Sequence, residues 1–224
     1  TCNSSVDNGP ENISGRRFAS SMPRSSRSSL QEHKSYFMPF KAGDRVIELG
    51  GGPGFPGTER PIIRPNLDTR PGPMVDIVAN LEERLPLADG GFDGVYSAFA
   101  LEHISWRKVR SFIAEIYRSL APGGLAVLIT ADTYQQCRKA AATPPEEWGD
   151  GISNLLFGGQ DYSDNTHKVA LSRPFAVKLF KEAGFWDVQT LDHPGILGPN
   201  GWERVETDFI IEARKSAAKI TFEL

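Results

Sequence analysis

Apolar residues divide the chain into a polar first part and a patterned remainder. Residues 1–29 are rich in Ser, Asn and Gly and hold few large apolar side chains. Such a composition does not bury enough surface to offset the entropy of ordering, so we expect a flexible arm. Residues 30–43 add several aromatic side chains and are expected to dock on the domain. From residue 44 to residue 224 apolar runs recur at short intervals, which predicts one folded domain.

Short apolar runs bounded by turn-forming residues predict strands. These runs are Arg45–Leu49, Pro61–Asp68, Met74–Ala79, Gly94–Ala98, Leu125–Thr130, Val188–Leu191 and Phe209–Ala213. One longer segment repeats its apolar residues with the period of a helix and ends at the Ala121–Gly124 turn. Its apolar positions are Val109, Phe112, Ile113, Ile116 and Leu120. A second helix is expected to begin at Ser172, with Pro174 in its first turn, and to end at Gly184.

The order of strands and helices predicts a doubly wound α/β sheet. The fully apolar run Leu125–Thr130 is typical of a strand in the middle of a parallel sheet. Residues 131–170 break the pattern with several prolines and glycines. We therefore expect an irregular segment there, holding a lid or a substrate loop.

Composition and charge narrow the function. The 224 residues carry a formal net charge of -3, which argues against a nucleic-acid-binding surface as the main function. The chain has 2 cysteines, in no metal-ligand spacing, and no apolar run near the length that spans a bilayer. Its first residues lack the charged-then-apolar pattern of a secretory signal. We expect a cytoplasmic protein that is not bound to a membrane.

A glycine-rich loop follows the first predicted strand, in the sequence VIELGGGPG at residues 46–54. Glycine is needed where a ligand approaches the main chain closely, because a Cβ atom would occupy the same space. The loop falls at the carboxyl edge of the sheet, where ligands of open α/β folds bind. Further candidates stand at the ends of the neighbouring strands. The candidate ligand-binding residues are Glu48, Gly50, Gly51, Gly52, Gly54, Asp68, Asn80, Leu81 and Ser97.

Two of these side chains suit a nucleoside. The carboxylate of Asp68, at the end of the second predicted strand, can accept two hydrogen bonds from a ribose diol. Asn80 follows the third strand, where an amide can pair with the edge of adenine.

Taken in order, these motifs resemble the class I S-adenosylmethionine (SAM)-dependent methyltransferase family over residues 44–213. The matching pieces are the E-x-G-x-G-x-G loop, Asp68, the LPLADGGFDGVYS stretch at Leu85–Ser97, the LEHI at Leu101–Ile104 and the LAPGG at Leu120–Gly124. The resemblance implies SAM as the cofactor, with S-adenosylhomocysteine as its product. It also implies a Rossmann-like, doubly wound, mostly parallel seven-stranded sheet with the last strand antiparallel.

The chain departs from the common family pattern between the glycine loop and the second strand. Prolines at 53, 56, 61 and 65 oppose the helix that most members place there. We expect that helix to be missing or reduced to a turn, as in a bacterial subgroup that the GGQ at 158–160 and His167 also resemble. Asn80 stands where the family more often has Asp.

The acceptor of the methyl group is expected to be a small molecule or a sugar-containing compound. His103 is the candidate general base, because it follows the fourth strand and its pKa suits proton transfer near neutrality. Asp132, Tyr134 and His167 are candidate acceptor contacts. His167 with Asp161 and Asp164 matches no metal-ligand spacing, so no metal is expected.

Two other functions compete with this interpretation. Residues 52–57 satisfy G-x-G-x-x-G, which favours a nicotinamide-dependent oxidoreductase, but the prolines oppose the helix that this motif requires. The shortened loop region also allows a methyltransferase-like domain that is inactive and serves as a scaffold.

Overall fold

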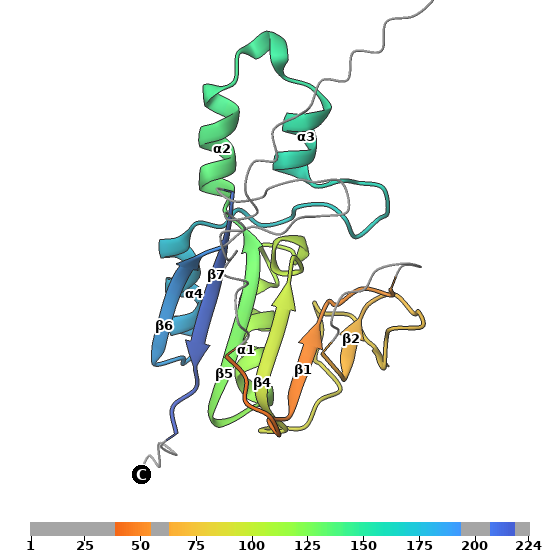
Figure 1. Ribbon diagram of the computed structural model, residues 1–224, viewed down its shortest axis with the longest axis vertical. Helices are drawn as coiled ribbons and strands as arrows, with labels where there is room; N and C mark the ends of the chain where they lie inside the picture. The colour runs from red at the N-terminus through yellow and green to blue at the C-terminus, as the bar shows by residue number, and fades with distance from the viewer. Residues whose placement is uncertain (1–38, 55–62, 194–206, 218–224) are drawn as a thin grey trace, which may run out of the picture. The chain divides into compact units, whose positions relative to one another are not determined.

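The computed structural model describes residues 39–54, 63–193 and 207–217, and it contains a seven-stranded sheet with the order β3-β2-β1-β4-β5-β7-β6 (Figure 1). The strands are β1 (Val46–Leu49), β2 (Asn66–Asp68), β3 (Ile77–Val78), β4 (Phe92–Ala98), β5 (Leu120–Ala131), β6 (Asp187–Asp192) and β7 (Asp208–Arg214). Strands β1 to β5 pair in parallel, whereas β7 is antiparallel to both β5 and β6. The predicted sheet, including its antiparallel last strand, is confirmed.

The chain reverses its direction of travel across the sheet between β1 and β4. It starts at β1, proceeds outward to β2 and β3, and then returns to add β4 on the other side of β1. The carboxyl ends of β1 and β4 therefore diverge into loops that leave in opposite directions. This switch point is where open α/β sheets place their ligands.

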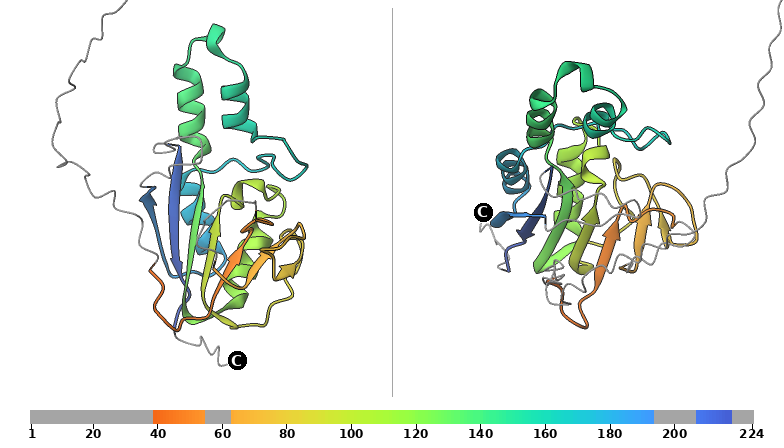
Figure 2. Two further views of the ribbon diagram at one scale, coloured as in Figure 1. Left: turned by 45° about the vertical axis from the view of Figure 1, so that its right-hand side comes forward. Right: turned by 45° about the horizontal axis from the view of Figure 1, so that its top comes forward.

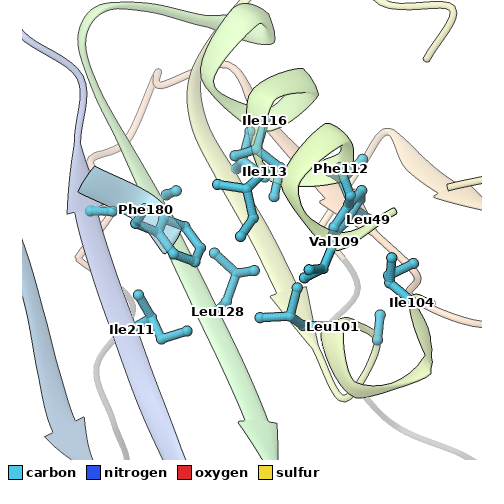
Figure 3. Close-up of a cluster of buried hydrophobic side chains, with 14 of the residues drawn as sticks. Leu49, Leu101, Ile104, Val109, Phe112, Ile113, Ile116, Leu128, Phe180 and Ile211 are labelled. Carbon is cyan, nitrogen blue, oxygen red and sulfur yellow. The ribbon is translucent and has the colours of Figure 1, made fainter. Parts of the chain in front are cut away.

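Helix α1 (Val109–Ser119) and helix α4 (Arg173–Glu182) pack on one face of the sheet. Figure 3 shows Phe112, Ile113 and Ile116 of α1 directed toward the sheet, with Phe180 of α4 beside Leu128. The predicted apolar face of α1 is confirmed, since all five of its positions are at most 1% exposed. The helix ends at Ser119, and its last predicted residue, Leu120, begins β5 instead.

A smaller cluster covers the opposite face of the sheet. Its buried members are Tyr96, Ala98, Leu125, Val127, Ile129 and Ile210. Phe40 packs against it, so closely that a Cβ atom on Gly94 would lie 2.5 Å from the Phe40 ring. The arm and the remainder of the docking segment, residues 1–38, lie outside the described residues, so the predicted division of the chain stays a prediction.

The prediction that residues 131–170 are irregular was wrong. The segment contains α2 (Thr133–Ala142) and α3 (Asp150–Phe157), joined by the short 3-10 helix η2 (Pro145–Glu147). Both helices stand beyond the carboxyl end of β5 (Figure 2). They escaped prediction because they bury little: α2 buries only Gln136 and Ala140, and α3 buries none of its residues. A short helix that buries few of its residues leaves only a weak periodic signal in the sequence.

Element ends also differ from the prediction. Strand β3 is limited to Ile77–Val78, and β5 extends back to Leu120 through a register shift opposite Phe92 and Gly94. Ser172 is the N-cap residue of α4 as predicted, although its hydroxyl makes no capping hydrogen bond. The predicted loss of a helix after the glycine loop falls on residues 55–62, which lie outside the described residues. None of the described helices is long and apolar enough to cross a membrane.

Candidate active site

The glycine loop is tied to the neighbouring strand β2 by three consecutive N–H groups. Gly50 donates to the Leu67 carbonyl (2.7 Å), and Gly51 donates to Asn66 Oδ1 (3.1 Å). Gly52 donates to Asp68 Oδ2 (2.9 Å). These N–H groups therefore shape the loop and hold it against β2.

Glycine is required in this loop by the chain itself. Gly50 has a φ of +75°, and a Cβ atom there would lie 2.5 Å from the Cβ of Ala100. A Cβ on Gly51 would lie 2.5 Å from Asn66 Oδ1. Both conflicts would push the loop away from its neighbours, because real Cβ atoms do not approach other heavy atoms so closely.

A cavity of about 200 Å³ opens beside this loop, at the switch point of the sheet. Five of the predicted residues line it: Gly50, Asp68, Asn80, Leu81 and His103. Its apolar wall is formed by Leu81, Phe99, Ala100 and Ile104. The cavity thus combines a carboxylate, an amide and an apolar wall.

Asp68 is almost fully buried and remains able to accept further hydrogen bonds. Its carboxylate accepts from the N–H groups of Gly52 and Arg70, and the guanidinium of Arg70 lies 3.7 Å away. A carboxylate offers about four acceptor positions, so about two remain for a ligand. Asn80 is held in a similar way: its Oδ1 accepts from the N–H of Glu82 (2.9 Å).

The other predicted cofactor residues lie outside the lining of this cavity: Glu48, Gly51, Gly52, Gly54 and Ser97. The fully buried Glu48 accepts from the N–H of Ile63 (3.2 Å), and the Ser97 hydroxyl donates to the Leu49 carbonyl (2.8 Å). A Cβ on Gly54 would clash with Met74. We interpret these residues as supports of the loop and of the end of β1.

A second cavity, of about 530 Å³, adjoins the first and shares Phe99, His103 and Tyr162 with it. Residues of α2, of α3 and of the segment after α3 contribute to its lining. The predicted contact His167 lines it together with His103, and the centroids of the two imidazole rings lie 5.3 Å apart. The Nδ1 atom of His103 lies 3.0 Å from the Thr166 carbonyl oxygen.

Two predicted acceptor contacts lie elsewhere. Asp132 is buried and caps α2 by accepting from the N–H of Gln135 (3.2 Å), and it also lies 3.5 Å from Arg173. Tyr134 is 59% exposed on the outside of α2. Neither residue lines either cavity. The helix that begins at Thr133 sets their positions, and the sequence pattern did not predict that helix.

Several residues of the site were missed. Arg70 stacks on the Tyr162 ring at 3.9 Å from its centroid, so the segment after α3 reaches over the end of β2. Burial raises the pKa of the Tyr162 hydroxyl. Glu102, which is buried, lines the larger cavity. Its place beside His103 was a usable signal, whereas nothing local marks Tyr162.

Part of the chain is similar in sequence to known methyltransferases. Residues 62–128 match a family model described as a methyltransferase domain. An uncharacterized methyltransferase of Synechocystis is 35% identical over 57 residues, which cover 25% of this chain and 27% of that protein. The chain thus matches about a quarter of the length of this curated relative.

Solved structures share the fold. A SAM-dependent methyltransferase from Mesorhizobium loti aligns with 77% of this chain and 91% of its own, at a TM-score of 0.51 and 22% identity. The complex of the Trm112 methyltransferase activator with a methyltransferase from Haloferax volcanii aligns with 80% of this chain and 85% of its own, at a TM-score of 0.52 and 18% identity. The chain thus has the fold of these solved methyltransferases, and its residues 62–128 are similar in sequence to a methyltransferase domain.

Proposed function

We propose that this protein transfers a methyl group from SAM to a small, hydroxyl-rich acceptor. The observation that carries this proposal is the pair of adjoining cavities that share His103. The smaller cavity lies at the switch point of the sheet, where open α/β folds bind their ligands, and the larger one has the volume of a small-molecule site.

The chemistry of the smaller cavity fits SAM. Asp68 suits the ribose hydroxyls, because two backbone N–H groups use only part of the acceptor capacity of its carboxylate and the rest can accept from hydroxyl donors. Asn80 and the apolar side chain of Leu81 suit the adenine ring. When bound, SAM supplies a methyl group already activated by its positively charged sulfur. The protein's main task is then to hold the acceptor in line with that methyl group.

The larger cavity suits an acceptor that carries hydroxyl groups. Gln136 contributes an amide side chain to its lining. Thr207 and Asn165 add further polar groups to the lining. A sugar-containing acceptor has the matching chemistry.

His103 is the candidate base for such an acceptor. The Thr166 carbonyl can only accept a hydrogen bond, so a neutral His103 donates from Nδ1 and carries its lone pair on Nε2. That lone pair can take the proton of an acceptor hydroxyl. The exposed, free Cys137 is in keeping with a reducing cytoplasm, where we place the reaction.

Calorimetric titration with SAM, S-adenosylhomocysteine and NAD tests this proposal. We expect binding of the first two ligands and none of NAD. Asp68→Asn should weaken SAM binding by about 10-fold to 100-fold, because hydrogen bonds to a charged group contribute about 1.5–3 kcal/mol. Asp76→Asn is the matched control: Asp76 accepts from the N–H of Asn66 beside the same strand but lies outside the cavity.

The outcomes separate the competing functions. NAD binding without SAM binding would favour the oxidoreductase. A folded protein that binds neither ligand would favour the inactive scaffold. Equal SAM affinity in Asp68→Asn and in the wild type would show that the cofactor does not bind in the smaller cavity.

A further inference from the structure

Glu102, His103 and His167 meet in the larger cavity. Each offers one possible ligand atom, and these three atoms lie within 4.8 Å of one another. Glu102 and His103 belong to the 3-10 helix η1 (Leu101–His103) that follows β4, and His167 belongs to the segment after α3. The spacing of His167, Asp161 and Asp164 along the sequence predicts no metal site. The fold brings His167 to a different pair of side chains.

Hydrogen bonds orient the side chains of His103 and Glu102 in a way that suits a metal ion. Metal-binding histidines commonly donate their second ring N–H to a carbonyl, which fixes the tautomer and directs the other nitrogen to the ion. The contact from His103 Nδ1 to the Thr166 carbonyl is of this kind. Glu102 is oriented likewise, since one of its oxygens accepts from the Thr130 hydroxyl (2.9 Å).

The backbone joins the two segments that carry the cluster. Lys168 donates its N–H to the carbonyl of Glu102 (2.8 Å), and His167 donates its own to the carbonyl of Phe157 (3.0 Å). Gly158, with a φ of +81°, allows this approach, because a Cβ atom there would lie 3.2 Å from the His167 ring. The position of His167 is therefore fixed on both sides.

We propose that Glu102, His103 and His167 form a binding site for a divalent transition-metal ion such as Zn²⁺ or Mn²⁺. Two imidazoles and one carboxylate favour such ions over Mg²⁺ or Ca²⁺, which prefer oxygen ligands throughout. Ligand atoms around a shared zinc ion lie roughly 3–3.5 Å apart, as follows from bonds of about 2.0–2.2 Å. Closing the cluster from 4.8 Å requires side-chain movements of about 1 Å. Three protein ligands leave open positions toward the cavity.

The ion would act on the acceptor, so this inference rests on the proposed function and deepens it. A hydroxyl bound to the ion has a lowered pKa and loses its proton to solvent. The resulting oxygen forms a bond to the methyl carbon as the bond from that carbon to sulfur breaks, and the sulfur becomes a neutral thioether. The His103 lone pair binds either a proton or the ion, so His103 is a ligand here and not a free base.

Metal binding can be measured without the unknown acceptor. Full-length protein, freed of any affinity tag and of metal with EDTA, is titrated with Zn²⁺ and with Mn²⁺ by calorimetry. We expect one ion per chain for at least one of the two metals. His167→Asn and Glu102→Gln should weaken binding at least about 100-fold, since even second-shell changes cost 10-fold to 100-fold. Glu147→Gln is the matched control, because this exposed carboxylate lines the same cavity outside the cluster.

A SAM titration of the same samples separates this inference from the proposed function. His167 lies outside the smaller cavity, so His167→Asn should bind SAM as the wild type does, which also shows that the variant is folded. Wild type that binds SAM but neither metal would overturn the metal site and return His103 to the role of base. Metal binding that survives in His167→Asn and in Glu102→Gln would overturn it as well. Failure of the wild type to bind SAM would instead contradict the proposed function.

Discussion

Arg45, which directly precedes β1, pairs with Asp93, the second residue of β4, at the amino end of the parallel strands and away from the site. The guanidinium of Arg45 donates to both carboxylate oxygens of Asp93, at 2.9 and 3.0 Å, and its backbone N–H donates as well. These hydrogen bonds lower the pKa of Asp93 from 3.8 to about 2. The pair is exposed, so water screens it and its contribution to stability is small.

The pH dependence of this pair has a definite sign. Because the folded pKa of Asp93 is depressed, its contribution is complete above the unfolded pKa of 3.8 and is lost as the pH falls toward about 2. Asp93→Asn should therefore lower the free energy of unfolding at pH 5, and the deficit should shrink between pH 4 and pH 2. Denaturant unfolding of both proteins across this range measures it. A deficit that grew with acidity would contradict the assignment.

At the scale of elements, Arg118 fastens the loop before β4 to helix α1. Its guanidinium donates to Glu115 Oε2 (2.7 Å) on the same helix and to the carbonyls of Leu85 (3.1 Å) and Leu87 (2.6 Å). It also pairs with Asp89 at 2.5 Å. The pKa of Glu115 is lowered chiefly by its hydrogen bond with Arg118. The apolar residues of this loop, Leu85 and Leu87, are thereby held in the core.

Removal of the Arg118 guanidinium should lower the free energy of unfolding. Arg118→Ala leaves two loop carbonyls without this donor and the mostly buried Glu115 without its positively charged partner, so we expect a loss of about 3 kcal/mol in the free energy of unfolding. Arg110→Ala is the control on the same helix, since its pair with Glu182 is exposed and should contribute less than about 1 kcal/mol. Equal losses in the two variants, in denaturant titrations, would refute this account.

The sequence predicted some of the helices and not others, and burial explains the difference. The face of α1 was predicted position by position, because burial against a sheet imposes a helical period on apolar residues. Helices α2 and α3 bury too little to carry that signal, and the prolines and glycines around them favoured a loop. The residues that line the larger cavity were consequently only partly found.

For the whole molecule, the site is a place where distant segments meet over the carboxyl edge of the sheet. The loops after β1, β2, β3 and β4 and the segment after α3 all line the smaller cavity. A ligand there should hold these segments together while leaving the central strand β5 unchanged.

Amide hydrogen exchange tests this picture. S-adenosylhomocysteine should slow exchange in residues 66–70, 80–82 and 158–168, because these segments line or flank the smaller cavity. The centre of β5, which is already buried, should show no change. NAD serves as the control ligand and should have no effect. Slowing confined to other segments, or absent at a saturating ligand concentration, would place the ligand elsewhere.

The sequence by itself determined the strands, the face of α1, the glycine loop and the carboxylate of Asp68 at the end of β2. Each of these follows from residues close together along the chain, where burial and turn chemistry impose a local pattern. Only the tertiary structure decided that the N–H groups of Gly51 and Gly52 bind side chains of β2, and that His167 lies beside His103. Such contacts depend on how the chain brings distant segments together, and the local pattern of apolar residues does not determine this.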